Sequence, residues 1–183
     1  MRAFSHDGPD VTLESIAADA GVGIGTLYRH FPTREALIEA AYRSELERLC
    51  AAVPGLIQTL PADIAMRTWM DRFIDYLVTK HGMAEALRMV IASGGNPFAQ
   101  SRKSLLEAIG SLLKAGAHQG KLRGDIDPSD VMFGISGVSL VAGESDQRDQ
   151  AGRLLDLLLD GLRYRPPSGT TPAAGSRTKS MRR

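Results

Sequence analysis

The amino-acid sequence predicts an all-α protein, and three observations carry that prediction. Apolar residues recur at helical spacings of three and four along most of the 183 residues, and Gly, Pro and short polar residues mark where these runs begin and end. Aromatic residues make up only 5% of the chain, whereas Ala, Leu and Gly are plentiful, which favours helices over a β-sandwich. No alternating pattern is long enough to indicate a strand.

The first two predicted helices are short and are separated by a tight turn. Thr12 has an N-cap side chain and precedes an apolar stripe, and Gly21 ends that run. A second run extends from Ile24 to Phe31, where Pro32 stops it. The members of the first stripe are Leu13, Ile16, Ala17 and Ala20.

Two longer helices are predicted next. Thr33 caps the first, whose stripe includes Leu37, Ala40 and Ala41 and reaches toward Leu49, and Pro54-Gly55 is expected to end it. Pro61 can open the second, which ends at Gly82. Its apolar residues repeat every four positions, at Ala65, Trp69, Phe73 and Leu77.

Four more helices complete the predicted body. A short one, Met83 to Ala92, is closed by Gly94-Gly95, and Asn96-Pro97 is expected to cap the next, which Gly116 and Gly120 bring to a loop. Asp127-Pro128 caps a helix from Val131 to Ala142, and a leucine-rich helix covers about Gln147 to Arg163. The stripe of the Asn96-Pro97 helix is Leu105, Ile109, Leu112 and Leu113.

Bulk charge and cysteine content narrow the class of protein. The formal net charge is only +1, so a nucleic-acid partner must be held by local placement of charge. No apolar run approaches the roughly 18 residues of a membrane span, and the N-terminus does not resemble a signal peptide, so we expect a cytoplasmic protein without a membrane partner. Cys50 is the only cysteine, and a packing role is a simpler expectation than a redox switch.

The second short helix has one apolar and one polar face. At about 100° per residue, Leu27 and Phe31 share the face that anchors the helix to a core. The opposite face carries Gly25, Thr26 and Arg29, with Tyr28 and His30 on its flanks. A face of this composition suits a DNA major groove, where Thr26 and Arg29 can reach base edges and the flanking side chains can donate to phosphates.

The motif around this helix resembles a known family. Ile16-Ala17, Ala20-Gly21-Val22, Gly25 to Phe31 and Arg34 to Leu37 are similar to the N-terminal DNA-binding domain of the TetR (tetracycline-repressor) family of bacterial regulators. The resemblance implies a helix-turn-helix head on a helical ligand-binding and dimerisation body. It also implies phosphate contacts from Thr12, Tyr28, His30 and Arg34, and base or backbone contacts from Gly23, Ile24, Gly25 and Thr26. Residues 120–127 and the two helices after them resemble an SbtR-like C-terminal domain.

The predicted domains follow from this resemblance. Residues 1–50 form the DNA-binding domain with its connecting helix, residues 51–165 form the effector-binding and dimerisation domain, and residues 166–183 form a disordered basic tail. Family members have a full helix before the motif, and only Arg2-Ala3-Phe4 could supply its last turn here. Either the coding sequence extends upstream of Met1 or the head lacks a packing partner.

The expected function is DNA-binding transcriptional regulation, with repression favoured. A homodimer joined through the last two long helices would bind a pseudo-palindromic operator on double-stranded DNA, and an unidentified small-molecule effector would release it. The rival hypothesis is a helical ligand-binding or dimerisation protein whose truncated head does not bind DNA. Candidate pocket residues, for which an ordinary apolar core is the alternative, are Trp69, Met70, Phe73, Met89, Leu106, Ile109 and Met132.

Other functions find little support in the sequence. Gly21 to Gly25 lacks the preceding strand and the spacing of a dinucleotide-binding loop, so we interpret it as a turn between helices. His30 has no second His or Cys at metal-ligand spacing, and Arg29 and Arg34 have solvated surface charge as their alternative interpretation. No set of catalytic side chains can be assembled, so we expect no enzyme activity, cofactor or metal.

Overall fold

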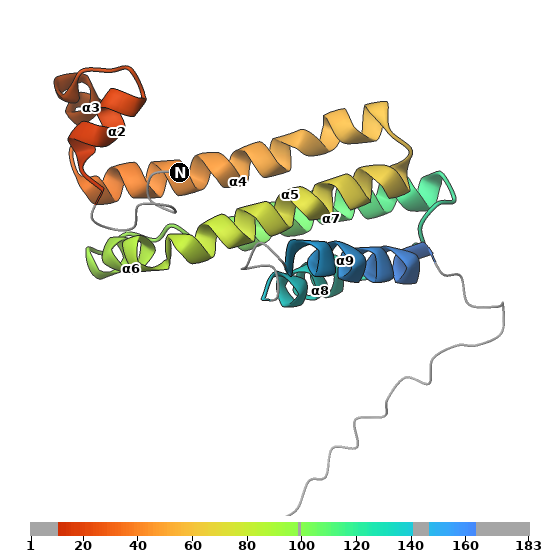
Figure 1. Cartoon of the computed structure of the whole chain (residues 1–183). Helices are drawn as coiled ribbons and strands as arrows, with labels where there is room; N and C mark the ends of the chain where they lie inside the picture. The colour runs from red at the N-terminus through yellow and green to blue at the C-terminus, as the bar shows by residue number, and fades with distance from the viewer. Residues whose placement is uncertain (1–10, 99, 141–146, 164–183) are drawn as a thin grey trace, which may run out of the picture.

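The computed structural model describes residues 11–98, 100–140 and 147–163. Within these ranges the chain forms eight α-helices and no strand, which confirms the predicted all-α class. None of these helices is both long and apolar enough to cross a membrane. The helices, labelled as in Figure 1, are α2 (Leu13–Asp19), α3 (Ile24–His30), α4 (Arg34–Thr59), α5 (Ala62–Gly82), α6 (Ala84–Ala92), α7 (Ser101–His118), α8 (Pro128–Ser139) and α9 (Arg148–Arg163).

The helices form a small head and a larger body that share α4. Figure 1 shows α2 and α3 at the N-terminal end of α4, on the side of that helix away from α5. In the body, α5 packs against α4 on one side and against α7, α8 and α9 on the others. The head is therefore carried on the end of a helix that is itself part of the body.

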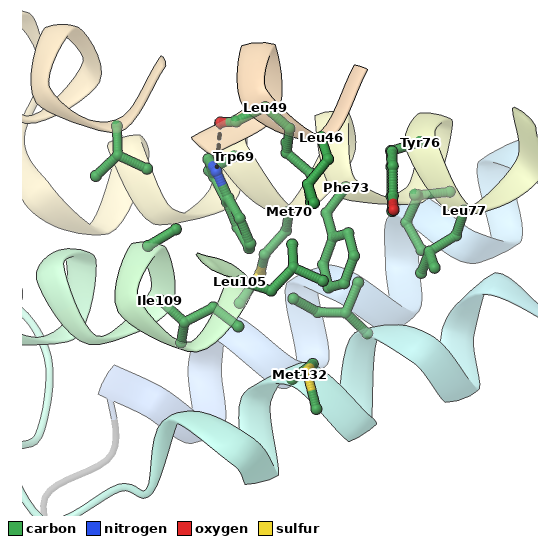
Figure 2. Packing of buried hydrophobic residues seen from close by; sticks show 14 of the residues in the cluster. Leu46, Leu49, Trp69, Met70, Phe73, Tyr76, Leu77, Leu105, Ile109 and Met132 are labelled. Atoms are coloured by element: carbon green, nitrogen blue, oxygen red, sulfur yellow. Dashed lines mark hydrogen bonds between the residues drawn. The ribbon is translucent and has the colours of Figure 1, made fainter. Parts of the chain in front are cut away.

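The body is built around the buried side of α5. Trp69, Met70 and Phe73 are almost completely removed from solvent, because the helices around α5 cover it on several sides. The Trp69 indole Nε1 donates a hydrogen bond of 3.1 Å to the carbonyl of Leu49 on α4, so its one polar atom is satisfied inside the core. Figure 2 shows this bond among apolar side chains from α4, α5, α7 and α8.

The prediction that Pro54-Gly55 ends the helix begun at Thr33 is wrong. Helix α4 continues through Pro54 to Thr59, although Pro54 has no N–H to donate to the carbonyl one turn earlier. Val53 and Leu56, on either side of the Pro-Gly pair, are 3% and 6% exposed. Burial of these side chains outweighs the local penalty, as tertiary packing commonly does.

The predicted helix start at Asn96-Pro97 is also wrong. Helix α7 begins at Ser101, and the backbone N–H of that residue donates to the carbonyl of Phe98 in a turn. The Phe98 ring meets the ring of Tyr42 edge-on, with 5.4 Å between centroids, so residues 96–98 pack against α4 in place of starting a helix. Gly116, expected to help end α7, lies inside it, and the chain turns at Gly120 with a φ of +66°.

The predicted start of α8 and the glycine that follows α6 are confirmed. Asp127 caps α8 by accepting from the backbone N–H of Ser129 at 2.7 Å, and Gly94, with a φ of +90°, follows α6. Helix α8 ends at Ser139, with Leu140 as its C-cap, so the predicted extension to Ala142 is wrong. The Arg2-Ala3-Phe4 segment and the tail from residue 166 lie outside the described residues.

Ion pairs attach α9 to α5. The Arg67 guanidinium donates to Asp156 at 2.6 Å and to the carbonyl of Gly152 at 3.1 Å, and it also pairs with Asp71 on its own helix. At the other end of α9, Arg163 pairs with Asp63 at 2.5 Å. Partial burial alone would raise the pKa of the Asp63 carboxyl, but the hydrogen bond and charge of Arg163 lower it below its ordinary value. These contacts fix which side of α9 faces the body.

Replacing Pro54 by alanine tests the account of α4. We expect Pro54→Ala to raise the free energy of unfolding by about 1–3 kcal/mol, because it restores a backbone donor inside an intact helix. Urea denaturation at one fixed protein concentration measures the change.

The matched control is the neighbouring residue. Gly55 is exposed, and a Cβ built there meets no atom within 4 Å, so Gly55→Ala should add no more than about 1 kcal/mol. A loss of stability in Pro54→Ala would mean that the proline is required for the path of α4.

Candidate nucleic-acid interface

Helix α2 is fixed by a side-chain cap and by close packing. The Thr12 hydroxyl accepts a hydrogen bond of 3.1 Å from the backbone N–H of Ser15, as the sequence predicts for an N-cap. Ala17 is 1% exposed, and its small side chain allows α2 and α3 to approach each other closely. The Ala17 carbonyl also accepts from the backbone N–H of Val22 at 2.9 Å, which holds the turn against the end of the helix.

The turn between the two helices depends on Gly21. This residue has a φ of +68°, a conformation that glycine adopts without the steric cost paid by other residues. Two residues later, Gly23 returns to extended backbone, and its carbonyl accepts from the N–H groups of Thr26 and Leu27. The chain thereby reverses direction in a few residues and starts α3 at an angle to α2.

Helix α3 presents the two faces that the sequence predicts. Leu27 is 7% exposed and belongs to the core, and Phe31 is partly buried against it, so the inward orientation of both is confirmed. Thr26, Arg29 and His30 are exposed, and the Tyr28 side chain is 45% exposed. Of the other predicted contacts, Thr12, Gly23 and Gly25 are exposed and Ile24 is half-buried.

This arrangement offers hydrogen-bond donors on a convex, accessible helix face. Tyr28 supplies a phenol, Arg29 a guanidinium and His30 an imidazole, all of which can donate to acceptor oxygens. Such donors match phosphate oxygens and the acceptor-rich edges of bases, although a direct role of each residue in DNA binding stays a prediction. Within the described ranges, His, Cys, Asp and Glu side chains do not come together in any group of three that could hold a metal ion.

Arg34 makes a contact that sequence reasoning missed. Its Nη1 donates a hydrogen bond of 2.5 Å to the carbonyl of Val11, the residue before the N-cap of α2. Thr33 caps α4 beside it by accepting from the backbone N–H of Ala36 at 3.1 Å. The start of α4 is therefore tied to the start of α2, a link between residues 23 positions apart that no local pattern reveals.

The predicted effector-pocket residues lie in the body. Trp69, Met70, Phe73 and Ile109 are buried side chains of the core, Met132 is 7% exposed, and Met89 and Leu106 are half-buried. Figure 2 shows several of them packed together with leucines of α4 and α7. Their role as a pocket lining stays a prediction.

A cavity of about 660 Å³ lies elsewhere, between α4 and the start of α7. Its lining comes from one side of α4, from residues 96–97 and from the first turn of α7. Sequence reasoning had no means of finding it, because its walls are separated by about 50 residues of chain and meet only in the folded protein.

Comparisons with known proteins identify the class of protein to which this chain belongs. Residues 1–41 match the model of the bacterial regulatory proteins of the tetR family, and residues 61–164, more than half of the chain, match the C-terminal domain of SbtR-like transcriptional regulators. Together with the helix-turn-helix formed by α2 and α3, these matches define a bacterial transcriptional regulator. The chain belongs to the TetR family, and the resemblance found in its sequence is confirmed.

Several relatives share nearly the full length. A TetR transcriptional regulator from Streptomyces coelicolor, SCO0520, is 55% identical in sequence, with a TM-score of 0.87 over 90% of this chain and 94% of that one. A TetR transcription regulatory protein from Mycobacterium vanbaalenii is 25% identical, with a TM-score of 0.71 over 88% and 89%. The HTH-type transcriptional repressor Rv1474c of Mycobacterium tuberculosis is 28% identical over 93% of this chain and 80% of that protein.

Two glycines of the head should respond in opposite directions to alanine. We expect Gly21→Ala to destabilise the head by about 1 kcal/mol, because alanine is strained at positive φ. Gly25→Ala, inside α3, should stabilise it by about 0.5–1 kcal/mol, since alanine favours helix. A Cβ at either position meets no atom within 4 Å, so steric crowding does not contribute to either change in stability.

Amide hydrogen exchange across residues 12–31 measures both effects without DNA. Protection should fall in Gly21→Ala and rise in Gly25→Ala. Equal changes in the two variants would contradict the assigned backbone conformations.

Proposed function

We propose that this protein represses transcription by binding a pseudo-palindromic operator as a homodimer, and that a small ligand in the body releases it. The observation that carries the proposal is the exposed polar face of α3, held outward by buried Leu27 at the end of α4. The naming of the Mycobacterium tuberculosis relative as a repressor supports repression over activation.

The proposed DNA contacts divide into two kinds. Thr26 and Arg29, on the exposed face of α3, reach base edges in the major groove. Thr12, Tyr28 and His30 contact phosphates around it. The backbone at Gly23, Ile24 and Gly25 approaches the duplex closely because two of these three residues lack side chains.

Arg34 stands at the junction of these contacts. We place it near a phosphate, as the resemblance implies, while its bond to Val11 orients the start of α2. Removing it would therefore disturb both a charge contact and the position of Thr12.

The proposed dimer interface lies on α8 and α9. Phe133 is 59% exposed, Leu157 is 69% exposed, and Leu140, which caps α8, is 75% exposed, an unusual set of large apolar side chains to leave in water. Leu155, Leu159 and Leu162 of α9 are buried against the body, and the ion pairs of Arg67 and Arg163 hold the helix on α5, so the side with Leu157 is left to meet a second copy. A two-fold axis through this surface would present two α3 helices to successive major grooves.

The domain boundary proposed near residue 50 falls inside α4, which runs from Arg34 to Thr59. The DNA-binding domain of residues 1–50 and the body of residues 51–165 therefore share a continuous helix. A ligand that shifts this helix in the body also shifts the head, and a coupling of about 1–3 kcal/mol is enough to release DNA.

The DNA contacts can be separated by their salt dependence. Arg34→Ala should weaken binding to every DNA sequence and reduce the slope of log affinity against log salt by about two for the dimer, because each protomer loses one phosphate contact. Thr26→Ala should change the preferred sequence and leave the slope as it is. Selection of bound DNA from a random pool, followed by titrations at several salt concentrations, measures both.

The outcomes distinguish the rival functions. Weaker binding by Arg34→Ala with an unchanged slope would make Arg34 a positioning residue only. Recovery of no DNA by the wild-type chain would favour the alternative of a helical ligand-binding protein whose head does not bind DNA.

The dimer surface is tested with a charged substitution. Leu157→Glu should convert the dimer to a monomer, because it places an unpaired charge in an apolar interface, and operator affinity should fall with it. Light scattering coupled to size exclusion gives the mass. The control, Ile91→Glu, alters an isoleucine that is 49% exposed on α6 and should leave the mass of the dimer unchanged. A dimeric Leu157→Glu protein would place the interface elsewhere.

A further inference from the structure

The cavity between α4 and α7, here called the α4–α7 groove, has an apolar floor and polar walls. Leu46 of α4 and Pro97 are buried beneath it, and Ala51 lines it from the exposed side of α4. Ser101 and Ser104 add hydroxyl groups from the first turn of α7. Its volume of about 660 Å³ is that of a site for a drug-sized molecule.

The groove reaches a buried chain of hydroxyl groups. The Tyr76 hydroxyl on α5 donates to the Tyr42 hydroxyl on α4 at 2.5 Å, and the Ser101 hydroxyl lies 3.4 Å from the same Tyr42 oxygen. Burial, followed by the contact with Tyr42, raises the pKa of Tyr76 far above its ordinary value, so this phenol stays protonated. Ser101 therefore lines the groove and also links α7 to α4.

The charges around the groove have a negative balance. Its one lining cation, Arg43, is paired with Glu39 at 2.6 Å, whereas the Glu47 carboxylate has no partner among the residues that the structure describes. Next to the groove, Lys103 lies 4.0 Å from Glu107. Lys103 and Glu107 match each other, and of the two charged side chains that line the groove, Arg43 is matched by Glu39 and Glu47 is left unmatched.

The thiol of Cys50 lies on the wall of the groove, and its pKa is affected by the negative charge nearby. Burial raises the pKa of Cys50, and the negative charge of Glu107 raises it further. The thiol is thus neutral at physiological pH, and its sulfur adds a polarisable surface to the groove.

We propose that the α4–α7 groove is the effector site, and that it takes an organic monocation with a flat apolar body. This inference rests on the proposed function, because it names the place and chemistry of the ligand that releases DNA. The apolar body lies over Leu46 and Pro97, and the positive charge faces Glu47.

This position gives the ligand direct access to the helix that carries the head. Tyr42 lies eight residues after Arg34, or about 12 Å along α4. A ligand between α4 and α7 replaces the contact between Ser101 and Tyr42 and separates the two helices at that level. The seven residues predicted from the sequence do not line this groove, and most of them are held in the packed core.

Thioflavin T, a flat monocation that fluoresces when it is immobilised, serves as the probe. Titrated into the full-length protein, it should bind at least about fivefold more tightly than its uncharged benzothiazole analogue, which lacks the ring N-methyl group. Glu47→Gln should weaken binding of the cation about three- to tenfold and leave the neutral analogue unaffected. Equal affinities of the two dyes, or no binding of thioflavin T, would overturn the assigned ligand class.

Location is tested by filling the groove. Ala51→Phe places a ring in the groove from an exposed position on α4 and should abolish binding of both dyes. Ala84→Phe, an equal change at an exposed alanine on α6 outside the groove, should bind both as the wild type does. Wild-type affinity in Ala51→Phe would show that the dye binds elsewhere and would overturn the assignment.

Regulation is tested on DNA selected from a random pool, with the operator affinity of each dye-free variant as its own reference. Thioflavin T should lower the operator affinity of wild type and Ala84→Phe by about fivefold or more, the range of allosteric coupling, and should not alter that of Ala51→Phe. Dye binding without an effect on DNA would overturn the regulatory role of the groove. A chain that binds dye but selects no DNA would contradict the proposed function while leaving the groove as a cation site.

Discussion

Trp69 lies between α4 and α5, where its ring packs against Phe73 and its indole nitrogen donates to the carbonyl of Leu49. This contact fixes α4 on the body at a point well beyond the head, and the burial of Val53 and Leu56 extends the attachment to the end of the helix. Because the body holds α4 in this way, the position of α3 in space is set by the body. The α3 surface proposed to face DNA and the α4–α7 groove therefore both depend on how α4 packs against the body.

Much of the architecture could be predicted from the sequence because it depends on neighbouring residues. The caps at Thr12, Thr33 and Asp127 form the expected bonds to the backbone of the first turn of their helices. The inward orientation of Leu27 follows from helical periodicity alone, and so does the burial of Ile109. These features involve contacts within one or two turns, where spacing and residue type decide the outcome.

The features that could not be predicted depend on residues far apart in the chain. Pro54 carries a strong local signal to end a helix, and only the core packing around it shows why α4 continues. Phe98 does not join the expected helix, because its ring packs against the ring of Tyr42, more than 50 residues earlier in the chain. The same limit applies to the bond from Arg34 to Val11, and to the groove that brings Ser101 beside α4. In each case the deciding neighbour is supplied by tertiary structure.

The bond between Arg34 and Val11 has a consequence for how an operator would sense movement of the body. It fastens the first turn of α4 to the entrance of α2, so a tilt of α4 carries the whole head with it as a unit. Arg34 lies 15 residues before Leu49, about 22 Å along the helix, so a tilt of about 5° at Leu49 moves the head about 2 Å. In the proposed two-fold dimer this displacement doubles to about 4 Å between protomers, which is more than the rise of one base pair. The two heads would then keep their structure but lie at a spacing that no longer matches the operator.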